Sequence, residues 1–175
     1  MRASVRSSAI AVERTDAASA CDTLSRMATP FESAQLILKL YELRREPLLR
    51  EARTWFVREF NPDTIADVQA VLASERNPHF RMVVGYWDMA CSLVVHGAVD
   101  RQMFLDANGE IFATFAKVHP LLAEIRQLAQ GPGFAKHLEQ VVMAVPGVEE
   151  RLEMLRKRFR SLAATTAAPV TVART

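Results

Sequence analysis

The sequence predicts an all-α protein: a single-domain irregular bundle of about seven or eight helices around a central buried helical hairpin. Three observations favour this fold. Prolines and glycines recur at intervals typical of helix ends, and apolar residues recur at spacings of three and four. No stretch alternates apolar and polar residues as a half-buried strand would. One domain is the expectation for a chain of 175 residues.

The chain begins with residues 1–29, which are rich in Ser, Ala and Arg and lack an apolar face. We expect a disordered tail there. Prolines then mark helix starts, where the missing N–H costs nothing and φ is already helical. One helix is expected from Phe31 to Arg45. Pro47 begins or kinks the next, which runs to Phe60.

Two Asn-Pro pairs repeat one start signal, in which Asn caps a helix and Pro takes its first position. Asn61 is expected to open a short helix, and Asn77 the central one. The central helix is apolar nearly all the way round over residues 83–95, so we expect it to be buried on all sides. Asp88 interrupts it, and the run is too short and too polar to span a membrane.

Gly97 is expected to end the central helix, and Asp100 to cap a second long helix that folds back on it. Pro120 begins or bends a further helix, and the Gly-Pro-Gly of residues 131–133 is the strongest break. The last helix has apolar residues four and three apart, typical of a coiled-coil seam: Val148, Leu152, Leu155, Phe159 and Leu162. A flexible tail is predicted from residue 164, which leaves residues 30–163 as the helical domain.

Composition excludes several function classes. The formal charge of +2 is too small to favour nucleic acid or an anionic membrane as a partner. The two cysteines, Cys21 and Cys91, lie in different contexts, so we expect no disulfide and a cytoplasmic location. No secretory signal is visible. The four histidines lie on different predicted segments without companions at metal-binding spacing, so no metal or cofactor is expected.

No catalytic constellation is visible either, and we expect no enzyme. Cys91 is predicted to be a core thiol. Asp88 is open to two interpretations, because an ionised carboxylate inside an apolar helix needs a partner. It could line a ligand pocket with Trp87 and Glu110. We favour the alternative, exposure at one edge of the helix or a structural ion pair with Arg81, Lys117 or Arg126.

Small residues predict close helix packing. Glycine inside a helix costs about 1 kcal/mol relative to alanine, so Gly109, followed one and two turns later by Ala113 and Ala116, is expected to admit another backbone. Gly85 is the counterpart in the hairpin, unless a second subunit occupies the groove. The seam of the last helix is a further candidate contact surface, at Leu152, Leu155 and Phe159.

Two basic clusters make nucleic-acid contact a further hypothesis. One cluster surrounds Pro47 and the other closes the last helix at residues 156–160. Glutamates are interleaved with the first cluster, and cations complement the dipole at a helix C-terminus. We therefore favour solvated faces for both.

Three segments resemble a known family: LREAR (49–53), YWDMACSLVVHGAVDRQMF (86–104) and FAKVHPLLAEIR (115–126). They are similar to an uncharacterised bacterial helical family of unknown function, whose members show a Leu-Val-x-x-Gly-x-x-Asp turn, then Phe, an aromatic-rich helix and an Ile-Arg ending. The resemblance covers about residues 31–145. It implies an all-helical fold and a bacterial origin, and it supplies no catalytic residues. Some relatives look membrane-anchored by an N-terminal hydrophobic helix, which we do not expect here.

Together these patterns favour a non-enzymatic, bacterial, cytoplasmic protein that acts through protein contacts or as a homo-oligomer. One alternative is a ligand-binding or sensor bundle with a pocket near Asp88. The other is a nucleic-acid-associated regulator that uses the arginine clusters.

Overall fold

The computed structural model describes residues 28–167, and over this range the protein is all-helical, as predicted. The two predicted tails fall mainly on residues 1–27 and 168–175, outside the described residues. The helical elements follow in this order: α2 (Pro30–Arg44), α3 (Pro47–Arg58), α4 (Ile65–Leu72), α5 (Asn77–Val95), α6 (Arg101–Ala107), α7 (Glu110–Val118), the 3₁₀ turn η1 (His119–Leu121), α8 (Leu122–Ile125), the π-helical turn η2 (Arg126–Gln130), α9 (Lys136–Met143) and α10 (Val148–Ala167).

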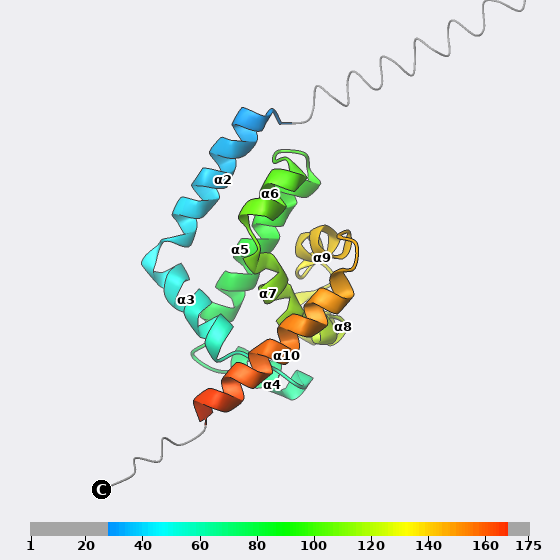
Figure 1. Ribbon diagram of the computed structural model, residues 1–175. Coiled ribbons are helices and arrows are strands. Elements are labelled where there is room, and N and C mark those ends of the chain that lie inside the picture. Colours follow the sequence, from blue (N-terminus) through cyan, green and yellow to red (C-terminus); the bar gives the residue numbers. More distant parts are fainter. Residues whose placement is uncertain (1–27, 168–175) are drawn as a thin grey trace, which may run out of the picture.

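Helix α5 is the central helix, as the sequence predicts (Figure 1). It packs mainly against α3 and α9, and α10 crosses α7 and α3. Trp87, at 0% exposure, is the largest of its buried side chains. The expectation of burial on all sides is wrong along one edge, where Gly85 and Met89 are exposed. Gly97 terminates the helix with a φ of 73°, a left-handed conformation that favours glycine.

The predicted second arm of the hairpin is also wrong, because it is two short helices rather than one long one. Asp100 caps α6 as predicted, and its Oδ1 accepts a hydrogen bond from the backbone N–H of Met103 at 2.8 Å. The helix then ends at Asn108, which is only 3% exposed and whose Nδ2 donates to the carbonyl of Phe104 at 2.9 Å. The chain turns at Gly109 before α7 begins.

The two Asn-Pro pairs do not act as caps. Helix α4 begins at Ile65, where Thr64 and Asp67 form a capping box. Asn61 lies before this start, and Asn77 donates from Nδ2 to the carbonyl of Leu72 at 2.8 Å. The prolines therefore mark the right regions, whereas the caps come from other residues.

An aromatic cluster fills the core between α3 and α5. Its rings lie 4.8 to 6.4 Å apart between centroids, in tilted, stacked and edge-to-face arrangements. The members are Trp55, Phe56, Phe60, Phe80 and Phe134. This cluster fixes α3 against α5. Because α2 directly precedes α3 in the chain, the cluster also fixes where the end of α2 lies.

Helix α2 forms one edge of the molecule (Figure 1), and polar contacts attach it there. Ser33 Oγ accepts a hydrogen bond from the backbone N–H of the α6 capping residue at 2.9 Å. The carbonyl of Leu40 accepts one from Tyr86 Oη at 2.7 Å. Arg44 Nη1 donates to Asn108 Oδ1 at 3.3 Å. The inner face of α2 is thus held at its start, middle and end.

Candidate functional site

The outer face of α2 carries a row of apolar side chains, three of which are exposed and one of which, Ala34, is partly covered by the rest of the described chain. We call the row the α2 seam. It consists of Phe31, Ala34, Leu38 and Tyr41, at spacings of three, four and three residues. Phe31 is 73% exposed, Leu38 58% and Tyr41 54%. A row at this spacing lies along one side of a helix, as in a coiled-coil seam.

The side of α2 that faces the protein has a different character. Of the residues that contact the body of the molecule, Ser33 and Arg44 are polar, whereas Leu40 is buried in the core and Ile37 packs against it. A surface helix usually buries its apolar stripe and exposes its polar one. Helix α2 buries a stripe of mixed polar and apolar residues and also leaves large apolar side chains exposed on its other sides, Leu36 and Leu43 among them.

The structure does not bring the three residues of the predicted pocket together. Asp88 contacts α9: its Oδ1 accepts hydrogen bonds from the backbone N–H groups of His137 at 2.8 Å and Leu138 at 2.9 Å. Its Oδ2 lies 3.3 Å from Nδ1 of His137. Asp88 therefore has a structural partner, but that partner is α9 and none of the three basic residues considered from the sequence. The residues next to the start of α9 provide no side-chain cap for this helix. The Asp88 carboxylate, from α5, acts as its N-terminal cap instead.

Trp87 and Glu110 both contact Arg44, on α2. The guanidinium carbon of Arg44 lies 5.4 Å from the centroid of the Trp87 ring, and its Nη2 lies 3.9 Å from Glu110 Oε2. Arg53 forms a two-pronged ion pair with Glu110, with Nε 2.7 Å from Oε1 and Nη2 on Oε2. The hydrogen bonds to Glu110 raise the pKa of Arg53 above its ordinary value.

An open depression of about 280 Å³ lies beside this ion pair. Its lining residues come from α3 and the start of α7: Arg50, Arg53, Thr54, Val57, Arg58 and Glu110. Because Glu110 occupies the guanidinium edge of Arg53, the ion pair mainly fixes α3 against α7. Two of the five arginines in the first basic cluster, Arg44 and Arg53, are therefore committed to contacts within the protein.

Lys117, which the sequence analysis considers only as a partner for Asp88, is a buried charge at 5% exposure. Its Nζ donates to the carbonyls of Phe56 at 2.8 Å, Val57 at 2.7 Å and Phe60 at 2.8 Å, at the C-terminal end of α3. Burial lowers the pKa of Lys117 to about 7. The three carbonyls and the dipole of α3 favour the ammonium and oppose this shift.

The close helix packing predicted around Gly109 is wrong within the described chain. A Cβ added at Gly109 or at Gly85 would meet nothing within 4 Å. Gly109 is exposed and lies between α6 and α7 rather than inside a helix, with a φ of -57° that other residues adopt equally well, so neither packing nor conformation requires a glycine here. Ala116 is fully buried and Ala113 is partly so. Contact of this surface with a second subunit stays a prediction.

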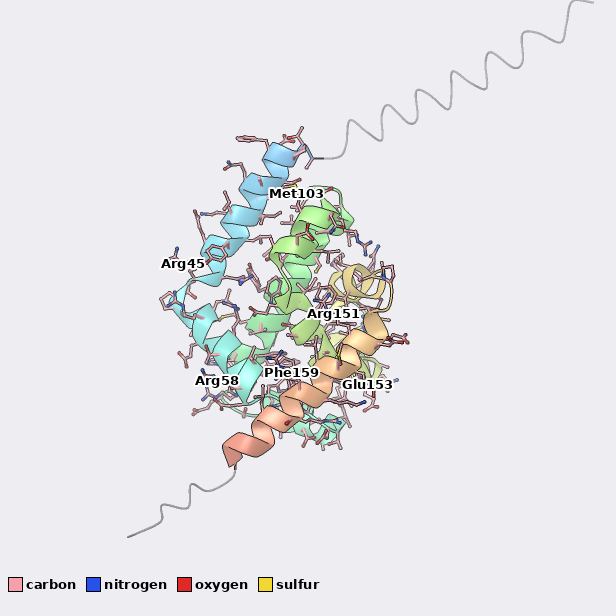
Figure 2. All side chains as sticks on the ribbon, in the orientation of Figure 1. Arg45, Arg58, Met103, Arg151, Glu153 and Phe159 are labelled. Carbon is pink, nitrogen blue, oxygen red and sulfur yellow. The ribbon has the colours of Figure 1, made fainter. Side chains whose placement is uncertain are left out.

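The seam of α10 is covered by the protein over its first part, whereas Leu162 near its end is 55% exposed. Leu152 is fully buried, Leu155 packs against the core, and α10 contacts α7 along this side. Figure 2 shows Phe159 on the side of α10 toward the body of the molecule and Glu153 on the other side. Nζ of Lys117 lies 4.4 Å from the centroid of the Phe159 ring. The coiled-coil spacing therefore reflects packing within the chain, not a demonstrated interface.

A second depression, of about 320 Å³, lies between α6 and the start of α10. We call it the α6–α10 groove. Its lining combines apolar residues with two arginines: Arg101, Gln102, Leu105, Asp106, Phe112, Ala144, Val145, Pro146 and Arg151. No sequence pattern predicted it, because the lining residues come from three separate segments.

The chemistry of the remaining candidate groups is limited. In the part of the chain that the structure describes, no three His, Cys, Asp or Glu side chains are placed to hold a metal ion. Cys91 is a buried free thiol, as predicted, and burial raises its pKa to about 12. None of the helices between residues 28 and 167 has the length and apolar character needed to cross a membrane.

Comparison with known proteins gives one match. The model of a family described as a domain of unknown function (DUF4760) matches residues 29–144. No curated protein and no solved structure matches the chain. The matched range includes α2 to α9 and excludes all of α10.

Proposed function

The chain belongs to the DUF4760 family, a domain of unknown function, and on this premise we propose that it is a non-enzymatic protein that self-associates through the α2 seam. The observation that carries the proposal is the orientation of α2. Its polar contacts face the protein, and Phe31, Leu38 and Tyr41 face outward, each more than half exposed.

A second copy of the same helix complements the seam. In an antiparallel pair centred between Ala34 and Leu38, each Ala34 faces the Leu38 of the other copy. Each Phe31 then faces a Tyr41, so two aromatic pairs flank two central pairs that combine a small with a large side chain. The helix carries two acidic and two basic side chains, Glu32, Glu42, Lys39 and Arg44, so its charges sum to zero and two copies do not repel one another.

The size of the seam indicates a weak dimer. With about 150–250 Å² for a fully exposed aromatic side chain, the exposed part of the seam is on the order of 400 Å² per copy. Two copies would bury about 800 Å², below the roughly 1,200–2,000 Å² of a stable interface. We therefore expect a dissociation constant that is micromolar or weaker. Such a contact would respond to protein concentration in the cell.

The structural roles of the candidate catalytic groups support the non-enzymatic part of the proposal. The carboxylate of Asp88 caps a helix, and the ammonium of Lys117 serves three carbonyls. Glu110 is committed to Arg53, and the pKa of Cys91 is about 12, so its thiol is not ionised at neutral pH. These four groups are thus committed to the fold.

The proposal also includes a bacterial origin and a cytoplasmic location. The free thiol of Cys91 suits a reducing compartment. Only four of the 22 basic residues are lysine, and this bias toward arginine is typical of a GC-rich genome.

Light scattering coupled to size-exclusion chromatography tests self-association directly. The full chain is loaded over a concentration range from about 1 µM to 1 mM, which brackets the expected affinity. Wild type is compared with Leu38→Glu, which places a charge in the middle of the seam. Met154→Glu is the matched control, because Met154 is 67% exposed on α10, away from the seam.

We expect the mass of wild type and of Met154→Glu to rise toward that of a dimer with concentration, and Leu38→Glu to stay monomeric. Monomeric wild type at the highest concentration would refute the proposal. Loss of the dimer in both variants would show that the contact is not at the seam.

A further inference from the structure

We propose that the α6–α10 groove binds a small carboxylic acid with an apolar body. This inference is independent of the α2 seam, since the groove and the seam share no residue. It rests on two arginines that line the groove without carboxylate partners, above an apolar floor.

Arg151 is the first of these arginines. Its guanidinium carbon lies 3.6 Å from the centroid of the Phe112 ring, so the planar group is held on the aromatic face. Figure 2 shows Arg151 on the side of α10 toward the body of the molecule. A stacked guanidinium uses its face for the ring and keeps the N–H groups at its edge for an acceptor.

Arg101 is the second, and it is held from the other side of the groove. Its Nη2 donates to the carbonyl of Val141 at 3.1 Å, in the last turn of α9. One N–H of the five is used in this way, and the contact fixes the position of the rest. The side chain is therefore already ordered before any ligand arrives, which lowers the entropy cost of binding.

The charges in the groove do not cancel. Neither Arg101 nor Arg151 has an ion pair with a carboxylate of the described residues. The acid in the groove is Asp106, which accepts a hydrogen bond from Nε2 of Gln102 at 2.9 Å. Two positive charges thus face one negative charge, which leaves an excess suited to one anion.

The apolar floor of the groove determines what kind of group the ligand carries besides its carboxylate. Phe112 is 3% exposed, and Leu105 and Val145 pack against the core beside it. The volume of about 320 Å³ is at the small end of the range for small-molecule sites. Arg101 and Arg151 are both exposed, so a carboxylate can reach them while the apolar part of the ligand lies against the floor.

A linear fatty acid of medium length is a suitable probe. The full chain, labelled with ¹⁵N, is titrated with octanoate and separately with 1-octanol, which has the same tail without the charge. Amide shifts locate the site and their dependence on concentration gives the affinity. We expect octanoate to shift residues 101–106 and 144–151 and to bind at least about tenfold more tightly than octanol.

Arginine variants identify the groups that hold the carboxylate. Arg151→Gln should weaken octanoate binding by about tenfold or more, and Arg151→Lys should have an intermediate effect, since it keeps the charge without the stacked plane. Arg101→Gln should weaken binding to a similar degree, because it removes the charge and the guanidinium that donates to Val141. Arg81→Gln is the control, because Arg81 is exposed on α5 and does not line the groove.

Three results would overturn the inference. Equal affinities for octanoate and octanol would show that the arginines do not recognise the charge. Shifts confined to residues outside the groove would place the binding elsewhere. Unchanged affinity in folded Arg151→Gln and Arg101→Gln, as judged by circular dichroism, would exclude both arginines as carboxylate ligands.

Discussion

The replacement Asp88→Ala tests the role of the carboxylate that reaches from α5 to the start of α9. It removes two hydrogen bonds to backbone N–H groups, at 2.8 and 2.9 Å, and the contact with the His137 ring. It also removes a negative charge from the positive end of the α9 dipole. The variant shortens the side chain without adding bulk, so the change reports on the cap.

The expected loss of unfolding free energy is the sum of the cap contribution and the dipole contribution. Loss of a helix N-cap costs about 0.5–2 kcal/mol, and the dipole contributes about 0.3–1 kcal/mol at a partly exposed site. The Asp88 side chain is 22% exposed, so water replaces the lost acceptor only in part. We expect a total loss of about 1–3 kcal/mol of unfolding free energy. For a domain of this size, the melting temperature should fall by about 2–12 °C.

Two variants separate the cap from the charge. Asp88→Asn keeps an oxygen acceptor and loses the charge, so it should cost about half as much as Asp88→Ala. Glu75→Ala removes an exposed carboxylate between α4 and α5 and should change stability by less than about 0.5 kcal/mol.

Urea denaturation followed by circular dichroism measures the free energies, and hydrogen exchange measures protection of residues 136–143. We expect faster exchange of the His137 and Leu138 amides in Asp88→Ala, because both lose their acceptor. A stability within about 0.5 kcal/mol of wild type, with unchanged exchange of both amides, would refute the cap.

Two further predictions concern buried charges. Lys117→Met should cost about 2–4 kcal/mol in urea denaturation, because three carbonyls lose their donor. With a folded pKa of about 7 and an ordinary value of 10.5, the unfolded state holds the proton over a range where the folded state releases it. The stability of wild type relative to Lys117→Met should therefore rise between pH 7 and about pH 10, and a flat difference would show that the carbonyls keep Lys117 charged. A double-mutant cycle on Arg53 and Glu110 should give a coupling of about 1–3 kcal/mol, and the exposed pair of Glu153 and Lys157, 2.8 Å apart, about 0.5 kcal/mol or less. Equal couplings would contradict the structural role of the first pair.

The helices that the sequence predicts correctly are those whose ends carry local signals. Gly97 ends α5, and Asp100 caps α6, because each acts within three or four residues of its own position. The break at Asn108 carries a signal as well, since Asn followed by Gly is typical of a helix end. The prediction of one long helix was wrong because it placed Gly109 inside that helix rather than at the break between α6 and α7.

No nearby residue in the sequence indicates which groups Asp88 contacts. Its partners on α9 lie 49 and 50 residues away along the chain. The apolar run around it predicts that it needs a partner but does not say which one. The same holds for Lys117, whose acceptors lie 57 to 61 residues earlier. Likewise, the seam spacing of α10 does not show whether the partner helix belongs to the same chain.

Helix α9 is closed at both ends by side chains from elsewhere: Asp88 of α5 at its start and Arg101 of α6 at its end. A helix of eight residues does not persist alone in water. We therefore expect α9 to form only after α5 and α6 have come together, late in folding. Its first residue is set by where Asp88 lies in space rather than by the length of the preceding loop at residues 131–133. We expect insertions in that loop to leave the position of α9 unchanged.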